Sequence, residues 1–139
     1  MVMNCGGDLR KARLAYMKKA APTAEKHEVR TPEDRMNKTE RAYYEYLMAH
    51  LQEWGIREVR FEGLTVKLAD DTRYTPDFMV LFYEKPMELH EVKGTSKKTG
   101  KPRWEDDAKV KFKVCREQNR QWKFFAVHKG LSGGWEAAL

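Results

Sequence analysis

The feature that most constrains this chain is a pair of strand-like segments joined by a short turn, residues 73–94, with the sequence RYTPDFMVLFYEKPMELHEVKG. Apolar residues dominate both segments, as expected for strands buried in a sheet. Three charged residues, Asp77, Glu91 and Lys93, nevertheless lie among them. Because a buried charge is costly unless it has a partner, these three residues bear directly on what the protein does.

The spacing predicts that the three charged side chains meet. Side chains alternate across a strand, so Glu91 and Lys93 point to the same face. If residues 82–86 form the turn of a hairpin, Asp77 lies directly opposite Glu91, and a turn one residue shorter still leaves them neighbours. Facing carboxylates repel each other, and a cation between them removes that repulsion. The pattern therefore predicts a cation site.

The chemistry of this trio suits phosphodiester hydrolysis. Carboxylate oxygens suit Mg²⁺, which takes one or two protein carboxylates together with water and substrate phosphate. A neighbouring lysine can orient or deprotonate a water molecule, or stabilise developing charge. The ordinary alternative is a strand-edge acid at Asp77 and a surface ion pair between Glu91 and Lys93. Three such residues together inside apolar strands favour the site.

Glu40 is a fourth candidate, with two interpretations open. On an ideal helix it lies on the apolar stripe of the segment that follows, close to Tyr44, Leu47 and Leu51, which favours a role in the metal site. The sequence NKTE also resembles a capping box, in which Asn37 begins the helix and Glu40 bonds back to it.

The remaining chain predicts an α/β fold with a mixed sheet and helices packed on it. The expected elements are a helix within 36–55, strands at 56–61, 64–68, 74–82 and 87–93, a turn at 69–72, a helix at 104–119, a strand at 123–128, and a turn at 131–134 before a short tail.

Basic residues gather on the second helix and on the loop before it. Four of them recur at i, i+4, i+7 and i+11, which places them within about 60° on a helical wheel: Lys109, Lys113, Arg116 and Arg120. The loop 94–103 adds Lys97, Lys98, Lys101 and Arg103. A solvated cationic face is the plain explanation, but like charges at i, i+4 destabilise a helix. A polyanion such as DNA, gripped through its phosphates, would explain the pattern.

The 139 residues, 41% of them hydrophobic, suit one domain. We expect a basic arm over residues 1–36, partly disordered or helical with a helix over 8–20, which either contacts phosphates or is a frayed terminus without a role, and a folded domain over residues 37–139. The sequence has no apolar run approaching the roughly 20 residues of a membrane span and no signal-peptide core. Two cysteines far apart in sequence are not a disulfide framework, so we expect a cytoplasmic protein. There is no phosphate-binding loop that would indicate a nucleotide cofactor, and His90, which faces away from Glu91, is expected to be structural.

The stretches YTPDF, HEVKG and WEDDAKVKFKVCREQ together resemble the PD-(D/E)xK nuclease superfamily. More narrowly, they resemble phage endonuclease I-type Holliday-junction resolvases and related small phage nucleases. The resemblance runs from about Asn37 to Lys129. It implies a restriction-endonuclease-like core of αβββαβ order, with a mixed central sheet flanked by helices.

The resemblance also implies roles for particular residues. Asp77 and Glu91 would be metal-binding acids, Glu40 would match the glutamate of the first helix, and Val92 would lend its backbone carbonyl to the metal. Lys93 would be the catalytic lysine. The expected activity is Mg²⁺-dependent endonucleolytic cleavage of branched DNA by a homodimer in the bacterial host cytoplasm, with Mn²⁺ able to substitute.

Two other functions remain open. The first is a nucleic-acid-binding module whose acidic residues are purely structural. The second is a nicking or restriction-like nuclease that acts on duplex DNA with the same fold.

Overall fold

A computed structural model describes residues 31–139. The elements in chain order are η1 (Pro32–Arg35), α2 (Lys38–Ala49), β1 (Ile56–Phe61), β2 (Val66–Ala69), β3 (Thr72–Tyr74), β4 (Phe78–Phe82), β5 (Glu88–Lys93), α3 (Asp106–Gln118), β6 (Lys123–Lys129) and β7 (Trp135–Ala137). The predicted helix over residues 8–20 and the greater part of the predicted arm lie outside the described residues.

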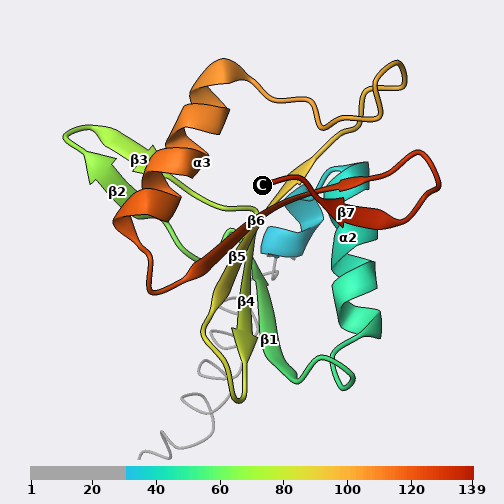
Figure 1. The fold of residues 1–139 in the computed structure, drawn as a ribbon. Coiled ribbons are helices and arrows are strands. Elements are labelled where there is room, and N and C mark those ends of the chain that lie inside the picture. Colours follow the sequence, from blue (N-terminus) through green and yellow to red (C-terminus); the bar gives the residue numbers. More distant parts are fainter. Residues whose placement is uncertain (1–30) are drawn as a thin grey trace, which may run out of the picture. The chain divides into compact units, whose positions relative to one another are not determined.

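Five of the strands form one mixed sheet in the order β1-β4-β5-β6-β7, and β2 pairs with β3 in a separate hairpin (Figure 1). Strands β1, β4 and β5 are antiparallel neighbours. Strands β5 and β6 are parallel, because α3 connects them and returns the chain so that both run in the same direction. The predicted α/β class with a mixed sheet is confirmed.

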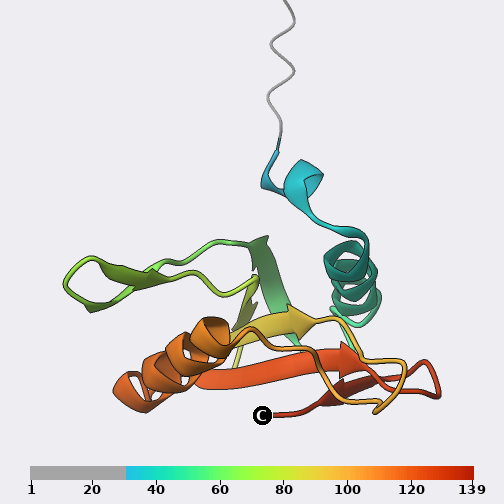
Figure 2. The same ribbon diagram turned by 90° about the horizontal axis from the view of Figure 1, so that it is seen from above.

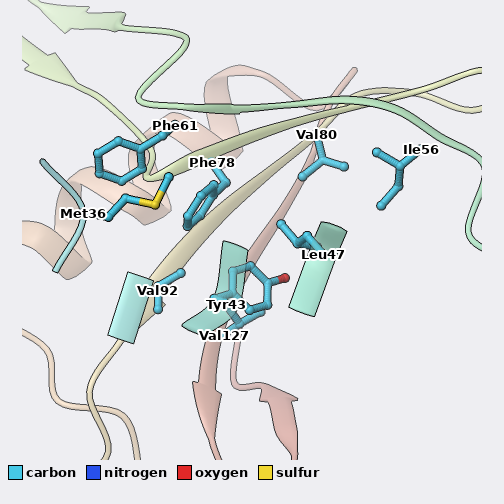
Figure 3. Packing of buried hydrophobic residues seen from close by; sticks show 9 residues of the cluster. All are labelled: Met36, Tyr43, Leu47, Ile56, Phe61, Phe78, Val80, Val92 and Val127. Carbon is cyan, nitrogen blue, oxygen red and sulfur yellow. The ribbon is translucent and has the colours of Figure 1, made fainter. Parts of the chain in front are cut away.

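Each face of the sheet carries its own apolar cluster and its own helix. On one face, Tyr43 and Leu47 of α2 pack with Phe78 and Val80 of β4 (Figure 3). The other cluster joins residues of α3 to the sheet, namely Phe112 and Cys115 with Met79, Leu89, Phe124 and Ala126. Figure 2 shows the two helices lying well apart, with α3 alongside the β2–β3 hairpin. The alternation along β4 therefore determines which side chains each helix covers.

One predicted strand, residues 74–82, is wrong as a single element. Strand β3 ends at Tyr74 and β4 begins at Phe78, and the two belong to different sheets. Pro76 between them has no backbone N–H to donate to a neighbouring strand and restricts the residue before it, so it separates the two strands. The break places Asp77 directly before β4.

Two other boundaries differ from the sequence prediction. The first helix ends at Ala49 rather than continuing towards Gly55, and Gly55 adopts a positive φ of 64° just before β1. The predicted C-terminal tail is also wrong, because residues 135–137 form β7 and pair antiparallel with β6. A three-residue strand is too short to show an alternating pattern in the sequence.

The folded region includes residues that the sequence analysis assigned to the arm. Pro32–Arg35 form a short 3-10 helix, and Met36 is buried in the same cluster as Tyr43 and Phe78. Arg35 also forms an ion pair of 2.9 Å with Glu62. Within residues 31–139, neither helix has the length and apolar character that crossing a membrane requires.

Candidate active site

The hairpin of β4 and β5 brings Asp77 and Glu91 face to face. Phe78 pairs with His90, so the next step of the same antiparallel register sets Asp77 against Glu91, as the spacing predicted. A carboxylate oxygen of Asp77, Oδ2, accepts a hydrogen bond of 2.7 Å from the backbone N–H of Val92. The side chain of Asp77 is thereby tied to the strand that carries Glu91 and Lys93.

Glu91 is buried, and both of its carboxylate oxygens have donors. The hydroxyl of Tyr74 donates to Oε2 at 2.7 Å. The ammonium of Lys93 forms an ion pair with Oε1 at 2.8 Å. The side chain of Lys93 is largely buried too, and its nitrogen lies 4.7 Å from the centroid of the Trp104 ring. The predicted trio of Asp77, Glu91 and Lys93 is therefore assembled at one end of β5.

The surroundings of Asp77 disfavour the ionised form of its carboxyl group. Burial, followed by the negative charge of Glu91, raises the pKa of Asp77 to about 8, against the lowering effect of the Val92 hydrogen bond. Lys93 lies close enough to lower this pKa as well, but it does not offset the other two effects. Burial and the facing carboxylate thus outweigh the nearby positive charge and favour the protonated form of Asp77.

Glu40 forms the capping box that the sequence suggested as one of its two roles. Its Oε2 accepts from the backbone N–H of Asn37 at 2.8 Å, while Asn37 Oδ1 accepts from the backbone N–H of Glu40 at 2.9 Å. Burial raises the pKa of Glu40 despite this bond, and the charges of Glu62 and Glu91 raise it further. Glu40 thus begins α2 within the electrostatic field of the acidic pair.

The donor set fits a hard divalent cation only in part. Asp77 and Glu91 supply carboxylate oxygens, the kind of ligand that Mg²⁺ prefers, and two carboxylates are enough for an ion that keeps most of its waters. Over residues 31–139, however, no group of three or more His, Cys, Asp or Glu side chains is arranged to hold a metal ion. A metal would therefore be held by the facing pair, with Glu40 farther out.

The predicted DNA-binding residues lie on the loop and helix that follow β5. The loop residues Lys97, Lys98, Lys101 and Arg103 are exposed, as is Lys113 on α3, whereas Lys109 and Arg116 are half-buried. Arg120, the last residue of the predicted stripe, is exposed but lies beyond the end of α3 at Gln118. Arg103 donates to the backbone carbonyl of Thr95 at 3.2 Å and helps to close the loop. Two of these cations have partners on α3, since Arg116 lies over the Phe112 ring and Arg120 pairs with Glu117.

Sequence reasoning missed Tyr74 as a member of the site. The sequence pattern predicts that Tyr74 and Asp77 belong to one strand, 74–82. In such a strand the Tyr74 hydroxyl would lie far from Glu91. In the structure, Tyr74 belongs to the separate hairpin and reaches Glu91 from there. A signal was present in the sequence, since a tyrosine two residues before a proline can end one strand while the next begins beyond it.

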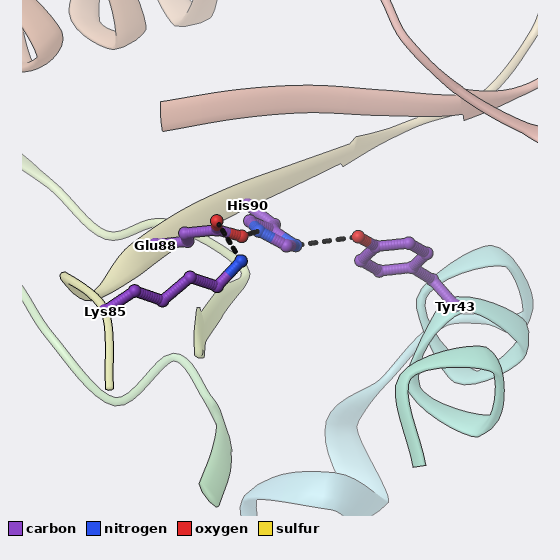
Figure 4. Close-up of polar contacts among 4 residues, drawn as sticks. All are labelled: Tyr43, Lys85, Glu88 and His90. Carbon is purple, nitrogen blue, oxygen red and sulfur yellow. Dashed lines mark hydrogen bonds and ion pairs between the residues drawn. The ribbon is translucent and has the colours of Figure 1, made fainter. Parts of the chain in front are cut away.

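The opposite face of the sheet holds a second polar cluster. His90 lies between Tyr43 and Glu88, at 2.7 Å from the Tyr43 hydroxyl and 2.9 Å from the Glu88 carboxylate, and Lys85 completes the chain at 3.3 Å from Glu88 (Figure 4). These residues line a cavity of about 350 Å³ whose other walls are aromatic and aliphatic side chains. The expected structural role of His90 agrees with this position, because it ties α2 to β5.

Comparison of the chain with protein-family models, with curated proteins and with solved structures finds no match. A functional assignment therefore depends on the geometry and charge of the Asp77–Glu91–Lys93 site and on the basic elements beside it.

Proposed function

We propose that residues 31–139 form a divalent-metal-dependent endonuclease that hydrolyses phosphodiester bonds of DNA. Asp77 and Glu91 would hold the metal, with the backbone carbonyl of Val92 as a further ligand and Glu40 as an outer acid. Lys93 would act on the phosphate or on the attacking water. Mg²⁺ is the expected ion, with Mn²⁺ as a substitute.

The observation that carries this proposal is the register of β4 and β5, which sets two carboxylates opposite each other with a lysine two residues further on. A like-charged pair across a sheet is destabilising, and burial together with the charge of Glu91 raises the pKa of Asp77. If the two acids had no function, replacing either of them with a neutral residue would increase the free energy of unfolding. A site that binds a cation needs both.

The proposed chemistry is hydrolysis of a phosphodiester. A bound divalent cation would neutralise charge on the phosphate and lower the pKa of a water molecule. Lys93 is positioned to stabilise the negative charge that develops on the phosphate oxygens. Water attacks phosphorus and loses a proton, one P–O ester bond breaks, and the leaving oxygen takes a proton, so that the cut strand gains one phosphate end and one hydroxyl end.

Support for DNA as the substrate comes from the cations around the site. The exposed lysines of the loop 94–103 and the basic face of α3 follow directly on the strand that carries Glu91 and Lys93. Apart from the β2–β3 hairpin between β1 and β4 and the C-terminal β7, the elements α2, β1, β4, β5, α3 and β6 follow one another as in the αβββαβ order implied by the resemblance to PD-(D/E)xK nucleases, which supports the proposal. That resemblance favours branched DNA and a homodimer that cuts two strands.

The experiment that tests the proposal compares a labelled four-way DNA junction with a linear duplex of matched sequence. Each substrate is incubated with the protein in Mg²⁺ or in EDTA. Asp77→Asn is run in parallel, and Asp70→Asn, which changes an exposed acid of the β2–β3 turn, is the matched control. We expect Mg²⁺-dependent cleavage that falls by at least about 100-fold in Asp77→Asn and is unchanged in Asp70→Asn.

Symmetric cuts confined to the junction would support a resolvase. Equal cutting of both substrates would support a duplex nuclease and reject the preference for branches. Cleavage that survives Asp77→Asn would reject the assigned site.

One observation favours the non-catalytic alternative, a DNA-binding module. Both oxygens of Glu91 are already engaged by Tyr74 and Lys93, as they would be if the acid had a purely structural role. This alternative predicts that the protein binds DNA equally well in Mg²⁺ and in EDTA, with no cleavage in either. The same experiment therefore separates the two functions.

A further inference from the structure

The two donors on Glu91 come from different parts of the fold. Lys93 lies on β5 itself, two residues from Glu91, so its contact is local. Tyr74 lies on β3, which pairs only with β2 among the described strands and is not part of the five-stranded sheet. The Tyr74 hydroxyl therefore links the small hairpin to the acid at the centre of the proposed site, at 2.7 Å from Glu91 Oε2.

The ring of Tyr74 is held in place by α3. It is only 7% exposed and meets the Phe112 ring edge to face, with 6.4 Å between ring centroids and 89° between ring planes. Phe112 is fully buried, so this contact cannot shift without disturbing the core of that face. A ring fixed in this way presents its hydroxyl to Glu91 in a single direction.

The hydroxyl of Tyr74 acts as a donor in this contact. A tyrosine hydroxyl carries its proton near neutral pH and can donate it to an acceptor at 2.7 Å. An ionised carboxylate only accepts hydrogen bonds. Since the bond to Oε2 is directional, it restrains rotation of the Glu91 carboxylate about its terminal torsion, which is otherwise a broad and weakly restricted one.

We infer that Tyr74 is a positioning residue of the metal site: its hydroxyl fixes the orientation of the Glu91 carboxylate so that Glu91 and Asp77 can bind one divalent cation together. The inference rests on the proposed function, because it concerns the same site. Residues that hydrogen-bond to a ligating carboxylate typically change metal affinity by 10–100-fold when they are removed. Tyr74 touches neither phosphate nor metal in this role.

A metal titration without DNA tests this inference. Mn²⁺ binding is measured by electron paramagnetic resonance for the wild type, for Tyr74→Phe and for the control Tyr46→Phe, whose half-buried ring lies on the other face of the sheet. Phenylalanine keeps the ring against Phe112 and removes only the hydroxyl. We expect the Kd for Mn²⁺ to rise by about 10-fold or more in Tyr74→Phe and to stay unchanged in Tyr46→Phe.

A merely structural role for Tyr74 would not change metal affinity selectively. DNA affinity in EDTA is therefore measured for the same variants, and Tyr74→Phe should match the wild type, since the basic loop and α3 are unaltered. Equal Mn²⁺ affinity of Tyr74→Phe and wild type would overturn the inference and leave the proposed function standing. A wild type that binds no Mn²⁺ would refute the proposed function itself.

A second measurement uses only the wild type and so does not depend on how well the variant folds. Protein carrying ¹³C-labelled tyrosine is titrated with substoichiometric Mn²⁺, which broadens nearby resonances. We expect the ring signal of Tyr74 to broaden first and that of Tyr83, in the turn at the other end of β5, to be spared. Uniform broadening, or loss of the Tyr83 signal alone, would place the metal elsewhere and contradict the inference.

Discussion

At the scale of single residues, the molecule keeps two acids together where apolar strands surround them. Asp77 and Glu91 face each other across β4 and β5, and only one ammonium, that of Lys93, pairs with them among the described residues. The imbalance raises the pKa of Asp77 to about 8, chiefly through burial and then through Glu91. Protonation of Asp77 or binding of a cation would each relieve the repulsion between the two acids.

This imbalance predicts that the metal-free protein loses stability as the pH rises through about 8. Folded Asp77 holds its proton up to about pH 8, whereas the unfolded chain releases it near 3.8, so the folded state binds more protons between these values. The stabilising contribution is complete below 3.8 and lost above 8. The loss should amount to about 1–3 kcal/mol after allowance for solvent screening.

Urea unfolding in EDTA from about pH 5 to about pH 9 measures this slope. Asp77→Asn should flatten most of it, while the control Asp70→Asn should keep it. Adding Mg²⁺ should stabilise the wild type most at high pH, where Asp77 is ionised. A slope that Asp77→Asn leaves intact would mean that other groups, such as Glu40, are responsible.

At the scale of elements, the N-terminus of α2 combines a structural and a chemical requirement. The capping box of Asn37 and Glu40 satisfies backbone groups that begin the helix. The same Glu40 feels the charge of Glu91, which helps to raise its pKa. Replacing Glu40 with residues that keep or remove the cap can separate the two roles.

We expect Glu40→Gln to leave the free energy of unfolding within about 0.5 kcal/mol of wild type, because glutamine can also complete a capping box. Glu40→Ala should lower it by about 1 kcal/mol. If Glu40 serves the metal site, both variants should reduce Mg²⁺-dependent cleavage by about 10–100-fold. The exposed control Glu45→Gln should change neither quantity, and full activity in Glu40→Gln would restrict Glu40 to capping.

The cations of the predicted basic stripe differ in their exposure and in their partners. Arg116 and Arg120 have partners on α3 itself, whereas Lys113 is exposed and forms no ion pair with any residue of the described chain. Cations that already have a partner are less available to phosphates. Among the predicted cations, Lys113 and the basic residues of the preceding loop are the exposed ones that form no ion pair within residues 31–139, and Lys109 is half-buried.

Lys113→Gln should weaken DNA binding in EDTA and reduce the slope of log K against log salt by about 1, the amount expected for one lost phosphate contact. Fluorescence anisotropy across a range of salt concentrations measures this slope. The matched control is Lys123→Gln, an exposed lysine at the start of β6, at the end of the sheet away from Lys93. Equal effects of the two variants would indicate unspecific attraction by net charge.

At the scale of the whole folded region, the sheet separates the proposed site from a second polar cluster on its opposite face. Asp77, Glu91, Lys93 and Tyr74 gather on the face that α3 covers, while Tyr43, His90 and Glu88 tie α2 to the other face. Burial works to raise the pKa of Glu88, but its bonds to His90 and Lys85 outweigh burial and lower it. This second cluster is satisfied internally, which suits a structural role.

Tyr43→Phe should lower the free energy of unfolding by about 1–2 kcal/mol, because it leaves a buried nitrogen of His90 without its partner. Cleavage per folded molecule should not change, since Tyr43 lies on the face away from the reactive residues. Urea unfolding and the cleavage assay are compared with Tyr83→Phe, whose exposed side chain should affect neither. A cleavage defect in Tyr43→Phe would show that the two faces are coupled.

Local sequence patterns suffice to predict the β4–β5 hairpin and the facing positions of Asp77 and Glu91. An apolar pattern of period two, a turn of known length and charged residues at fixed positions suffice to set Asp77 opposite Glu91, because strand geometry is local. The helix cap at Asn37 and the helix at 106–118 follow from equally local signals. These features need no knowledge of distant contacts.

Only the packing of distant elements shows which further residues lie at the proposed Asp77–Glu91–Lys93 site. Tyr74 reaches Glu91 only because Pro76 ends one strand and the small hairpin packs against α3. The burial of Met36 and the pairing of β7 also depend on surfaces formed by distant parts of the chain. Local propensity and periodicity carry no information on such contacts, since they depend on how separate elements pack. The strand pattern thus specifies the acids, and packing specifies the tyrosine that orients one of them.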